Sequence, residues 1–182
     1  MTNRVLYLLG CAAPPVLLLD RPVRAARAAG WTVCVGLTPT AAEWLGDDGV
    51  AALEETTGRP VRRVKRRPGE VSPWPEPSVS VVAPATLHTV DKVALGLTPD
   101  WLSGHAVEAI GRRLPLVVMP CVNSAYATHP QFGRSIATLR EAGVRVLYGA
   151  GSYEPHAPGG GPAEEYPWHL ALAAAEEAVR PG

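Results

Sequence analysis

Residues 79–90, with the sequence VSVVAPATLHTV, decide the fold. They begin with a short apolar run, Val79–Ala83, and continue into a turn of proline, small and hydroxyl-bearing residues. An apolar run without a polar face is typical of a strand in a parallel sheet that helices cover on both sides. Four further runs of the same kind occur along the chain, at Val5–Leu9, Val33–Leu37, Leu116–Met119 and Val144–Tyr148. Together these runs predict a sheet of parallel strands.

Segments with helical periodicity separate the apolar runs. The predicted helices are Leu17–Ala29, Ala41–Glu55, Asp91–Leu97, the stretch from Ser103 to Arg113, Arg134–Ala142 and Trp168–Val179. Thr40 and Ser103 are the predicted N-caps of two of them. Pro22 predicts that the first helix is kinked or begins only at Asp20. The alternation predicts a single α/β domain over residues 1–182, a Rossmann-like (flavodoxin-like) doubly wound parallel sheet with helices on both faces.

The composition fits one soluble domain with a proper core. The chain has 182 residues, 47% of them hydrophobic, and a formal net charge of zero. This balance gives no general attraction to nucleic acid or anionic lipid, so neither is an expected partner. The basic run Arg62–Arg67 is the exception. It is either a solvated edge strand or loop, or a docking patch for an acidic partner.

The cysteines and the hydropathy indicate a compartment. Three cysteines without metal-ligand spacing suit a reducing cytoplasm and predict no metal site. No segment approaches the roughly 18–20 apolar residues that span a bilayer. We therefore expect a cytoplasmic protein that does not bind membranes.

Small, hydroxyl-bearing and turn-forming residues follow four of the apolar runs, at Gly10–Ala13, Thr38–Ala41, Pro84–Thr89 and Pro120–Ser124. In a doubly wound sheet these segments meet at the carboxyl edge, where ligands bind. Each one alone is explained by an ordinary helix cap, but four at one edge favour a nucleotide-like ligand. The sequence lacks the glycine fingerprint of dinucleotide sites and the phosphate loop of ATP sites, which argues against NAD and ATP.

Two of these segments are similar to a known family. Residues 120–130, PCVNSAYATHP, resemble the Pro-x-Met-Asn-x-x-Met-Trp-x-x-Pro segment of the homo-oligomeric flavin-containing cysteine decarboxylases. Residues 83–97 resemble the family segment Ala-Pro-Ala-Ser/Thr-Ala-Asn-Thr-x-x-Lys-x-Ala-x-Gly-x. The resemblance extends from Val5 to about Tyr148, with the segments in the right order and spacing.

The resemblance implies FMN bound between the subunits of a trimer, which is often assembled further into a dodecamer. It implies that the FMN phosphate contacts the first loop, a threonine after the second strand and the third strand end. The residues concerned are Gly10, Cys11, Ala12, Thr38, Thr40, Thr86 and Thr89. The isoalloxazine ring would lie near Pro84, Ala85, Pro120 and Cys121.

The implied reaction is the oxidative decarboxylation of a C-terminal cysteine to an ene-thiol, on a ribosomal peptide that matures into a natural product. The coenzyme A branch of the family has a cysteine in its C-terminal third, and residues 154–162 contain none, so a peptide ending in cysteine is the favoured substrate. The Gly/Pro-rich residues 151–166 are either a flap that closes on the substrate or a flexible connector. The alternative function is an FMN-binding oligomer without decarboxylase activity; prenyl-flavin synthases of related fold are a weaker one.

The predicted catalytic residues are His88 and Asn123. Asn123 matches the asparagine of the family motif. A family histidine some fourteen residues before the Ala-Pro-Ala segment has no counterpart near Gly69–Trp74, and His88 replaces a family asparagine. His88 is therefore either the acid–base group or a helix-capping or trimer-contact residue. His129 and His156 are the next candidates, whereas His105 and His169 are expected to be structural.

Overall fold

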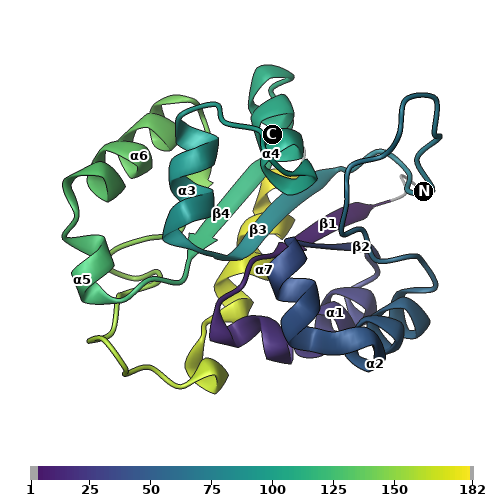
Figure 1. Cartoon of the computed structure of the whole chain (residues 1–182), viewed down its shortest axis with the longest axis horizontal. Helices are drawn as coiled ribbons and strands as arrows, with labels where there is room; N and C mark the ends of the chain where they lie inside the picture. Colours follow the sequence, from purple (N-terminus) through teal and green to yellow (C-terminus); the bar gives the residue numbers. More distant parts are fainter. Residues whose placement is uncertain (1–3, 181–182) are drawn as a thin grey trace.

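The computed structural model describes residues 4–180, which fold around one sheet of five parallel strands (Figure 1). Their order across the sheet is β2-β1-β3-β4-β5. The strands are β1 Val5–Gly10, β2 Thr32–Leu37, β3 Val79–Ala85, β4 Leu116–Pro120 and β5 Arg145–Val146. The predicted doubly wound parallel sheet is confirmed, and its order reverses between β1 and β3.

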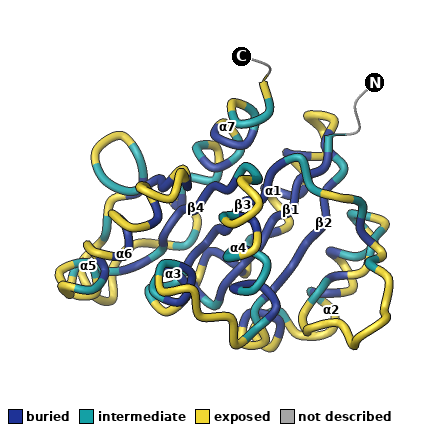
Figure 2. Tube along the Cα trace, turned by 90° about the horizontal axis from the view of Figure 1, so that it is seen from above, coloured by how far each residue is buried: buried dark blue, intermediate teal, exposed yellow. Residues whose placement is uncertain are grey.

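Helices cover both faces of this sheet. The helical segments are η1 Pro14–Leu18, α1 Asp20–Ala28, α2 Pro39–Thr57, α3 Leu87–Ala94, α4 Trp101–Gly111, α5 Ser124–Ala127, α6 Pro130–Glu141, η2 Ala163–Glu165 and α7 Trp168–Ala178. Helices α1 and α7 pack on one face and α3, α4 and α6 on the other, while α2 contacts both β2 and α1. The central strands are buried between these layers (Figure 2). No helix within residues 4–180 is long and apolar enough to cross a membrane.

Several predicted helix starts are wrong because other residues cap the helices. The first segment begins as the 3₁₀ helix η1, and α1 starts only at Asp20, which confirms the second of the two alternatives that Pro22 left open. Thr38 caps α2 in place of Thr40, since its hydroxyl accepts the Ala41 N–H and Pro39 occupies the first helical position.

Three further helices begin earlier than expected. Helix α3 starts at Leu87 and not at Asp91, because Thr86 is its N-cap. Helix α4 has Asp100 as its cap in place of Ser103, whose N–H donates to Asp100 Oδ1 at 2.8 Å. Helix α6 begins at Pro130, four residues before the predicted Arg134. The last strand is also shorter than the predicted Val144–Tyr148, because β5 lies at the edge of the sheet and pairs on one side only.

A segment after α2 covers the free edge of β2. Arg62 forms an isolated parallel bridge with Gly36, and its carbonyl accepts the Leu37 N–H at 2.8 Å. The Trp101 indole lies against Gly36 and donates to the Leu37 carbonyl at 3.2 Å. The Arg62 guanidinium stacks over the same indole, 4.4 Å from its centroid. The indole fits here because residue 36 has no side chain.

We expect Gly36→Ala to lower the free energy of unfolding by about 1–3 kcal/mol, the usual cost of overpacking a core. A Cβ at this position would lie 2.3 Å from two carbons of the Trp101 ring and 2.9 Å from Leu9 Cδ2. Urea unfolding followed by circular dichroism measures the change. Gly133→Ala in α6 is the control, because no atom lies within 4 Å of its added Cβ, and it should leave stability equal or higher. Equal stability of the two variants would contradict the packing argument.

Candidate functional site

Backbone hydrogen bonds beyond the strand ends join the loops at the carboxyl edge of the sheet. The Thr38 N–H donates to the Gly10 carbonyl at 3.0 Å. The Cys11 N–H donates to the Pro84 carbonyl at 3.0 Å, and the Cys121 N–H to the Ala85 carbonyl at 2.8 Å. The four segments that follow β1, β2, β3 and β4 therefore form one continuous rim.

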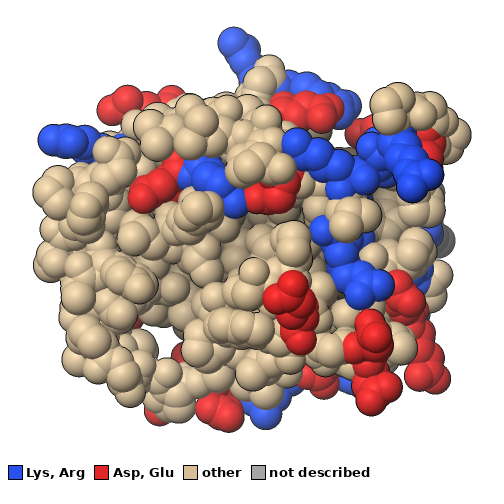
Figure 3. Space-filling view, in the orientation of Figure 1, with Lys and Arg blue, Asp and Glu red and all other residues tan. Residues whose placement is uncertain are grey.

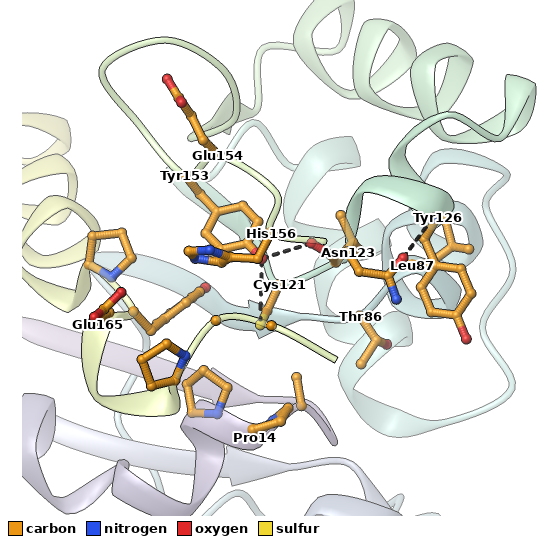
Figure 4. Close-up of a pocket in the computed structure, with 18 of the residues that line it drawn as sticks. Pro14, Thr86, Leu87, Cys121, Asn123, Tyr126, Tyr153, Glu154, His156 and Glu165 are labelled. Atoms are coloured by element: carbon orange, nitrogen blue, oxygen red, sulfur yellow. Dashed lines mark hydrogen bonds between the residues drawn. The ribbon is translucent and has the colours of Figure 1, made fainter. Parts of the chain in front are cut away.

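A cavity of about 700 Å³ opens at this rim, beside the point where the strand order reverses (Figure 4). This volume lies within the roughly 300–1,000 Å³ of small-molecule sites. Its walls come from the segments after β1, β3 and β4 and from the chain between β5 and α7: Ala12–Pro15, Thr86, Leu87, Cys121–Asn123, Tyr126, Ser152–Glu154, His156, Gly159–Pro162 and Glu165–Pro167. In the space-filling view the molecule is hollowed where residues 151–166, hereafter the flap, arch away from the body (Figure 3).

The predicted site residues divide into those that line the cavity and those that support it. Ala12, Thr86, Cys121 and Asn123 line it. Behind them lie the buried residues Gly10, Cys11, Pro84, Ala85, Thr89 and Pro120. Thr38 is half-buried beside Gly10 and Thr40 is exposed on α2, and neither lines the cavity. His88 is exposed at the second position of α3 and is also outside the cavity wall of this chain.

The start of α3 offers donors to an anion. The first amides of a helix have no intrahelical acceptor and carry the positive end of its dipole. Thr86 and Leu87, which form this start, line the cavity. The Thr86 hydroxyl accepts the Thr89 N–H at 3.3 Å and lies 3.1 Å from the Thr89 hydroxyl. A phosphate at this position would meet a hydroxyl and backbone N–H groups together.

The Cys11 thiol lies beneath this helix start and is not an acid–base group at neutral pH. Its burial raises its pKa to about 11, although hydrogen bonds from Thr89 and Thr86 act in the opposite direction. The thiol therefore stays protonated and uncharged. Cys11 supports the wall and does not react with the cavity's contents.

Asn123 has its side chain fixed by the helix that follows it. Its Oδ1 accepts the Tyr126 N–H at 2.9 Å and so caps α5. The amide nitrogen is then turned into the cavity, on the side of Thr86 (Figure 4). Capping therefore leaves Asn123 with an NH₂ group as a donor for a bound carboxylate or carbonyl.

The flap is attached to the segment after β4 by specific hydrogen bonds. The Ser124 N–H donates to the His156 carbonyl at 2.7 Å. The Tyr153 hydroxyl donates to the Val122 carbonyl at 2.8 Å, and the Tyr166 hydroxyl to the Met119 carbonyl at 2.7 Å. Burial raises the pKa of both tyrosines, which therefore remain donors. Both ends of the flap are thus held to the strand that brings Asn123 to the cavity.

His156 is a functional candidate that the sequence ranked below His88. It lines the cavity from the flap, close to the wall formed by Tyr153 and Cys121 (Figure 4). Its ring packs on Gly161, where an added Cβ would lie 2.4 Å from His156 Cδ2 and where φ is +82°. Only glycine fits both the contact and the backbone. In the sequence, the run of glycines after His156 is the one feature consistent with a side chain that packs on the flap.

The remaining histidines have local roles. His105 Nε2 lies 2.8 Å from Ser80 Oγ, and burial lowers the pKa of its ring, so it is neutral. His129 caps α6 by accepting the Gln131 N–H at 3.2 Å. His169 is exposed on α7. Across residues 4–180, His, Cys, Asp and Glu form no group that could hold a metal ion.

Comparison with known proteins agrees with this architecture. The family model described as Flavoprotein matches residues 23–168. The chain belongs to the Flavoprotein family. No curated protein sequence matches it.

Three solved structures are similar to the chain over nearly its whole length. The first is the FMN-dependent cysteine decarboxylase SpaF, with 21% identity over 98% of both chains and a TM-score of 0.74. The second is the FMN-dependent cysteine decarboxylase TvaF from thioviridamide biosynthesis, with 20% identity over 97% of this chain and 98% of that one and a TM-score of 0.72. The third is the cypemycin decarboxylase CypD, with 20% identity, 98% and 94% coverage and a TM-score of 0.72. At these identities the similarity establishes the fold.

Proposed function

We propose that this flavoprotein is an FMN-dependent decarboxylase that oxidises the C-terminal cysteine of a ribosomal peptide to an ene-thiol. The observation that supports this most directly is the cavity itself. It combines an anion-binding helix start, the Asn123 amide and a flap that carries a histidine. Similar structures are FMN-dependent cysteine decarboxylases, which agrees with the proposal.

The residues present fit FMN. The phosphate of FMN requires N–H and hydroxyl donors, which Thr86 and the start of α3 offer. The ring of FMN requires apolar walls, and Leu87, Val122 and Tyr166 line the same cavity. When bound, FMN supplies the chemistry of accepting a hydride equivalent from the Cβ atom of the cysteine as its thiol loses a proton. The protein's part is to orient that cysteine and to manage a proton.

Asn123 is proposed to hold the substrate carboxylate through its NH₂ group until carbon dioxide leaves. Carboxylates accept hydrogen bonds from such donors, and the cap to Tyr126 fixes the amide's direction. The oxidised substrate is a thioaldehyde, whose β-carboxylate is lost readily because the thiocarbonyl stabilises the developing charge. Enclosure by the flap would keep water from this reactive species.

The thiol of the substrate must lose a proton, because its ordinary pKa of about 8.5 leaves little thiolate at neutral pH. Two observations support His156 over His88 as the group that takes it. His156 lines the cavity and His88 does not. The contact with Gly161 also holds the His156 ring in one place. We therefore assign the proton transfer to the flap.

The proposed substrate class and assembly rest on further features. Residues 151–166 contain no cysteine that could reduce the ene-thiol, so the unsaturated peptide is the product. We propose that the protein works as a homotrimer, assembled further into a dodecamer. Tyr126 supports this, because it lines the cavity while 55% of it is exposed in the single chain. Leu95 and Leu97 at the end of α3 are exposed as well.

The cofactor proposal predicts that the purified protein is yellow and, by light scattering, a trimer or larger. Thr86→Val should weaken FMN binding by about 10–100-fold, because a hydrogen bond to a charged group contributes about 1.5–3 kcal/mol. Fluorescence titration of the apoprotein measures this, with Thr86→Ser as the control that keeps the hydroxyl. Equal FMN affinity in the two variants would place the phosphate elsewhere.

The reaction itself is tested with synthetic peptides that end in cysteine. We expect mass spectrometry to show the loss of one carbon dioxide and two hydrogens per peptide. A peptide with the cysteine carboxylate amidated should not change. A yellow oligomer that leaves every such peptide intact would support the alternative, an FMN-binding oligomer without decarboxylase activity.

The assignment of the proton transfer predicts opposite results for two histidine variants. His156→Ala should keep its colour and oligomeric state but lose turnover by about 10²–10⁴-fold, the usual contribution of general acid–base catalysis. His88→Ala should change turnover by less than about threefold. Loss of turnover in His88→Ala with full turnover in His156→Ala would transfer the role to His88.

A further inference from the structure

The basic run forms an exposed loop with fixed ends. We define the basic loop as residues 62–70. At its start Arg62 is bridged to Gly36, and beyond its end the Trp74 indole donates to the Pro60 carbonyl at 2.9 Å. Residues 63–71 between these anchors are exposed. The structure thus favours a solvated loop over an edge strand for most of this run.

Cavities lie on both sides of the basic loop. One, of about 950 Å³, extends toward α2, and the other, of about 640 Å³, extends toward α4. Both are lined by Arg62, Lys65, Arg66 and Trp74, and the two cavities together are called the groove below. Neither shares a lining residue with the cavity at the carboxyl rim. Lysine and arginine side chains gather on the side of the molecule where this loop runs (Figure 3).

Most cations of the basic loop have no carboxylate partner. Within residues 4–180, Arg62, Lys65, Arg66 and Arg67 form no ion pair. Lys65 Nζ donates to the Thr98 carbonyl at 2.7 Å, and the Arg66 guanidinium to the Glu70 carbonyl at 2.8 Å. These neutral acceptors leave the charges uncompensated.

The charges are also crowded. Burial lowers the pKa of Arg62, and the nearby positive charge of Arg66 lowers it further. Among the groups that face the loop, Arg112 is paired with Glu76 and Glu108, and Arg63 lies 3.6 Å from Asp47. The Glu70 carboxylate accepts the Arg67 backbone N–H at 2.9 Å. The Glu108 carboxylate offsets part of this effect at Arg62, and a bound anion would offset more of it.

The groove also has an apolar component. Val64 and Val71 are 71% and 89% exposed, and both line the cavity toward α2. Tyr7, Trp74 and Trp101 line the cavity toward α4. A ligand that fits carries carboxylates and apolar side chains in one flexible chain, which describes an acidic peptide.

We propose that the basic loop binds an acidic segment of the peptide substrate, upstream of the cysteine that enters the rim cavity. This inference rests on the proposed function, because it presumes a peptide substrate. A nucleic acid fits less well, since the exposed Val64 and Val71 in this groove offer contacts to apolar side chains, which a phosphate backbone does not carry.

The test uses a fluorescein-labelled peptide of alternating glutamate and leucine with an amidated end and no cysteine, so that binding is independent of decarboxylation. We expect fluorescence anisotropy to show binding that weakens with salt. The double variant Arg66→Gln/Arg67→Gln should raise its Kd at least about fivefold, as expected for the loss of two exposed charge contacts. The matched control Arg21→Gln/Arg24→Gln removes the same charge from α1 and should change the Kd less than about twofold.

The outcomes separate this inference from the proposed function. Equal binding of a peptide with glutamine in place of glutamate, or equal loss of affinity in the control variant, would overturn the inference. Tighter binding of a labelled single-stranded DNA of similar length would overturn it in favour of a nucleic-acid site. A protein that binds the acidic peptide but decarboxylates no cysteine-terminated peptide would retain the docking site and contradict the proposed decarboxylase function instead.

Discussion

The hydrogen-bonded ladder of the parallel strands continues past the strand ends, and the candidate site depends on this continuation. In an ordinary sheet the loops diverge as soon as pairing stops. Here the amides of Thr38, Cys11 and Cys121 each donate to a carbonyl of the neighbouring segment. The small residues around them allow the backbones to approach closely, because no side chain separates adjacent segments. The rim therefore holds the start of α3 and the start of α5 at fixed positions, and Thr86 and Asn123 reach the same cavity as a consequence.

The flap extends this constraint to a segment with little regular structure. Tyr153 and Tyr166 place their hydroxyls on carbonyls of the chain that leaves β4, while their rings pack together with 5.7 Å between centroids. A buried hydroxyl that finds an acceptor avoids the cost of an unsatisfied polar group. Each bond therefore fixes the flap against Met119 or Val122. Between Tyr153 and Tyr166 the chain reverses its direction, which uses the left-handed conformations of Gly159 and Gly161. His156 lies in this reversing segment.

The sequence predicted the sheet well because the signal for a covered parallel strand is local: an apolar run followed by a turn. It predicted helix starts less well, because caps depend on which of several nearby polar residues accepts the first N–H groups of the helix, as Thr38 and Asp100 do and Thr40 and Ser103 do not. The same limit explains why the sequence does not show which histidine lines the cavity. Position after a strand indicates that His88 is near the rim, but only the geometry of α3 shows its side chain on the exposed surface while Leu87 lines the cavity. No local sequence pattern predicts that the flap brings His156 next to Asn123. That proximity comes from tertiary hydrogen bonds made by Tyr153, Tyr166 and Ser124.

The place of the basic loop follows from the same sheet. Strand order leaves β2 at an edge, and an uncovered edge offers unpaired backbone groups to other chains. Arg62 covers it through backbone hydrogen bonds with Val35 and Leu37, and the Trp101 indole lies on Gly36 with the Arg62 guanidinium above it. The chain that continues from Arg62 cannot turn back into the core, which the indole already fills, so it extends into solvent with its positive charges outward. The arrangement that covers the edge of β2 therefore also exposes the cations of the basic loop.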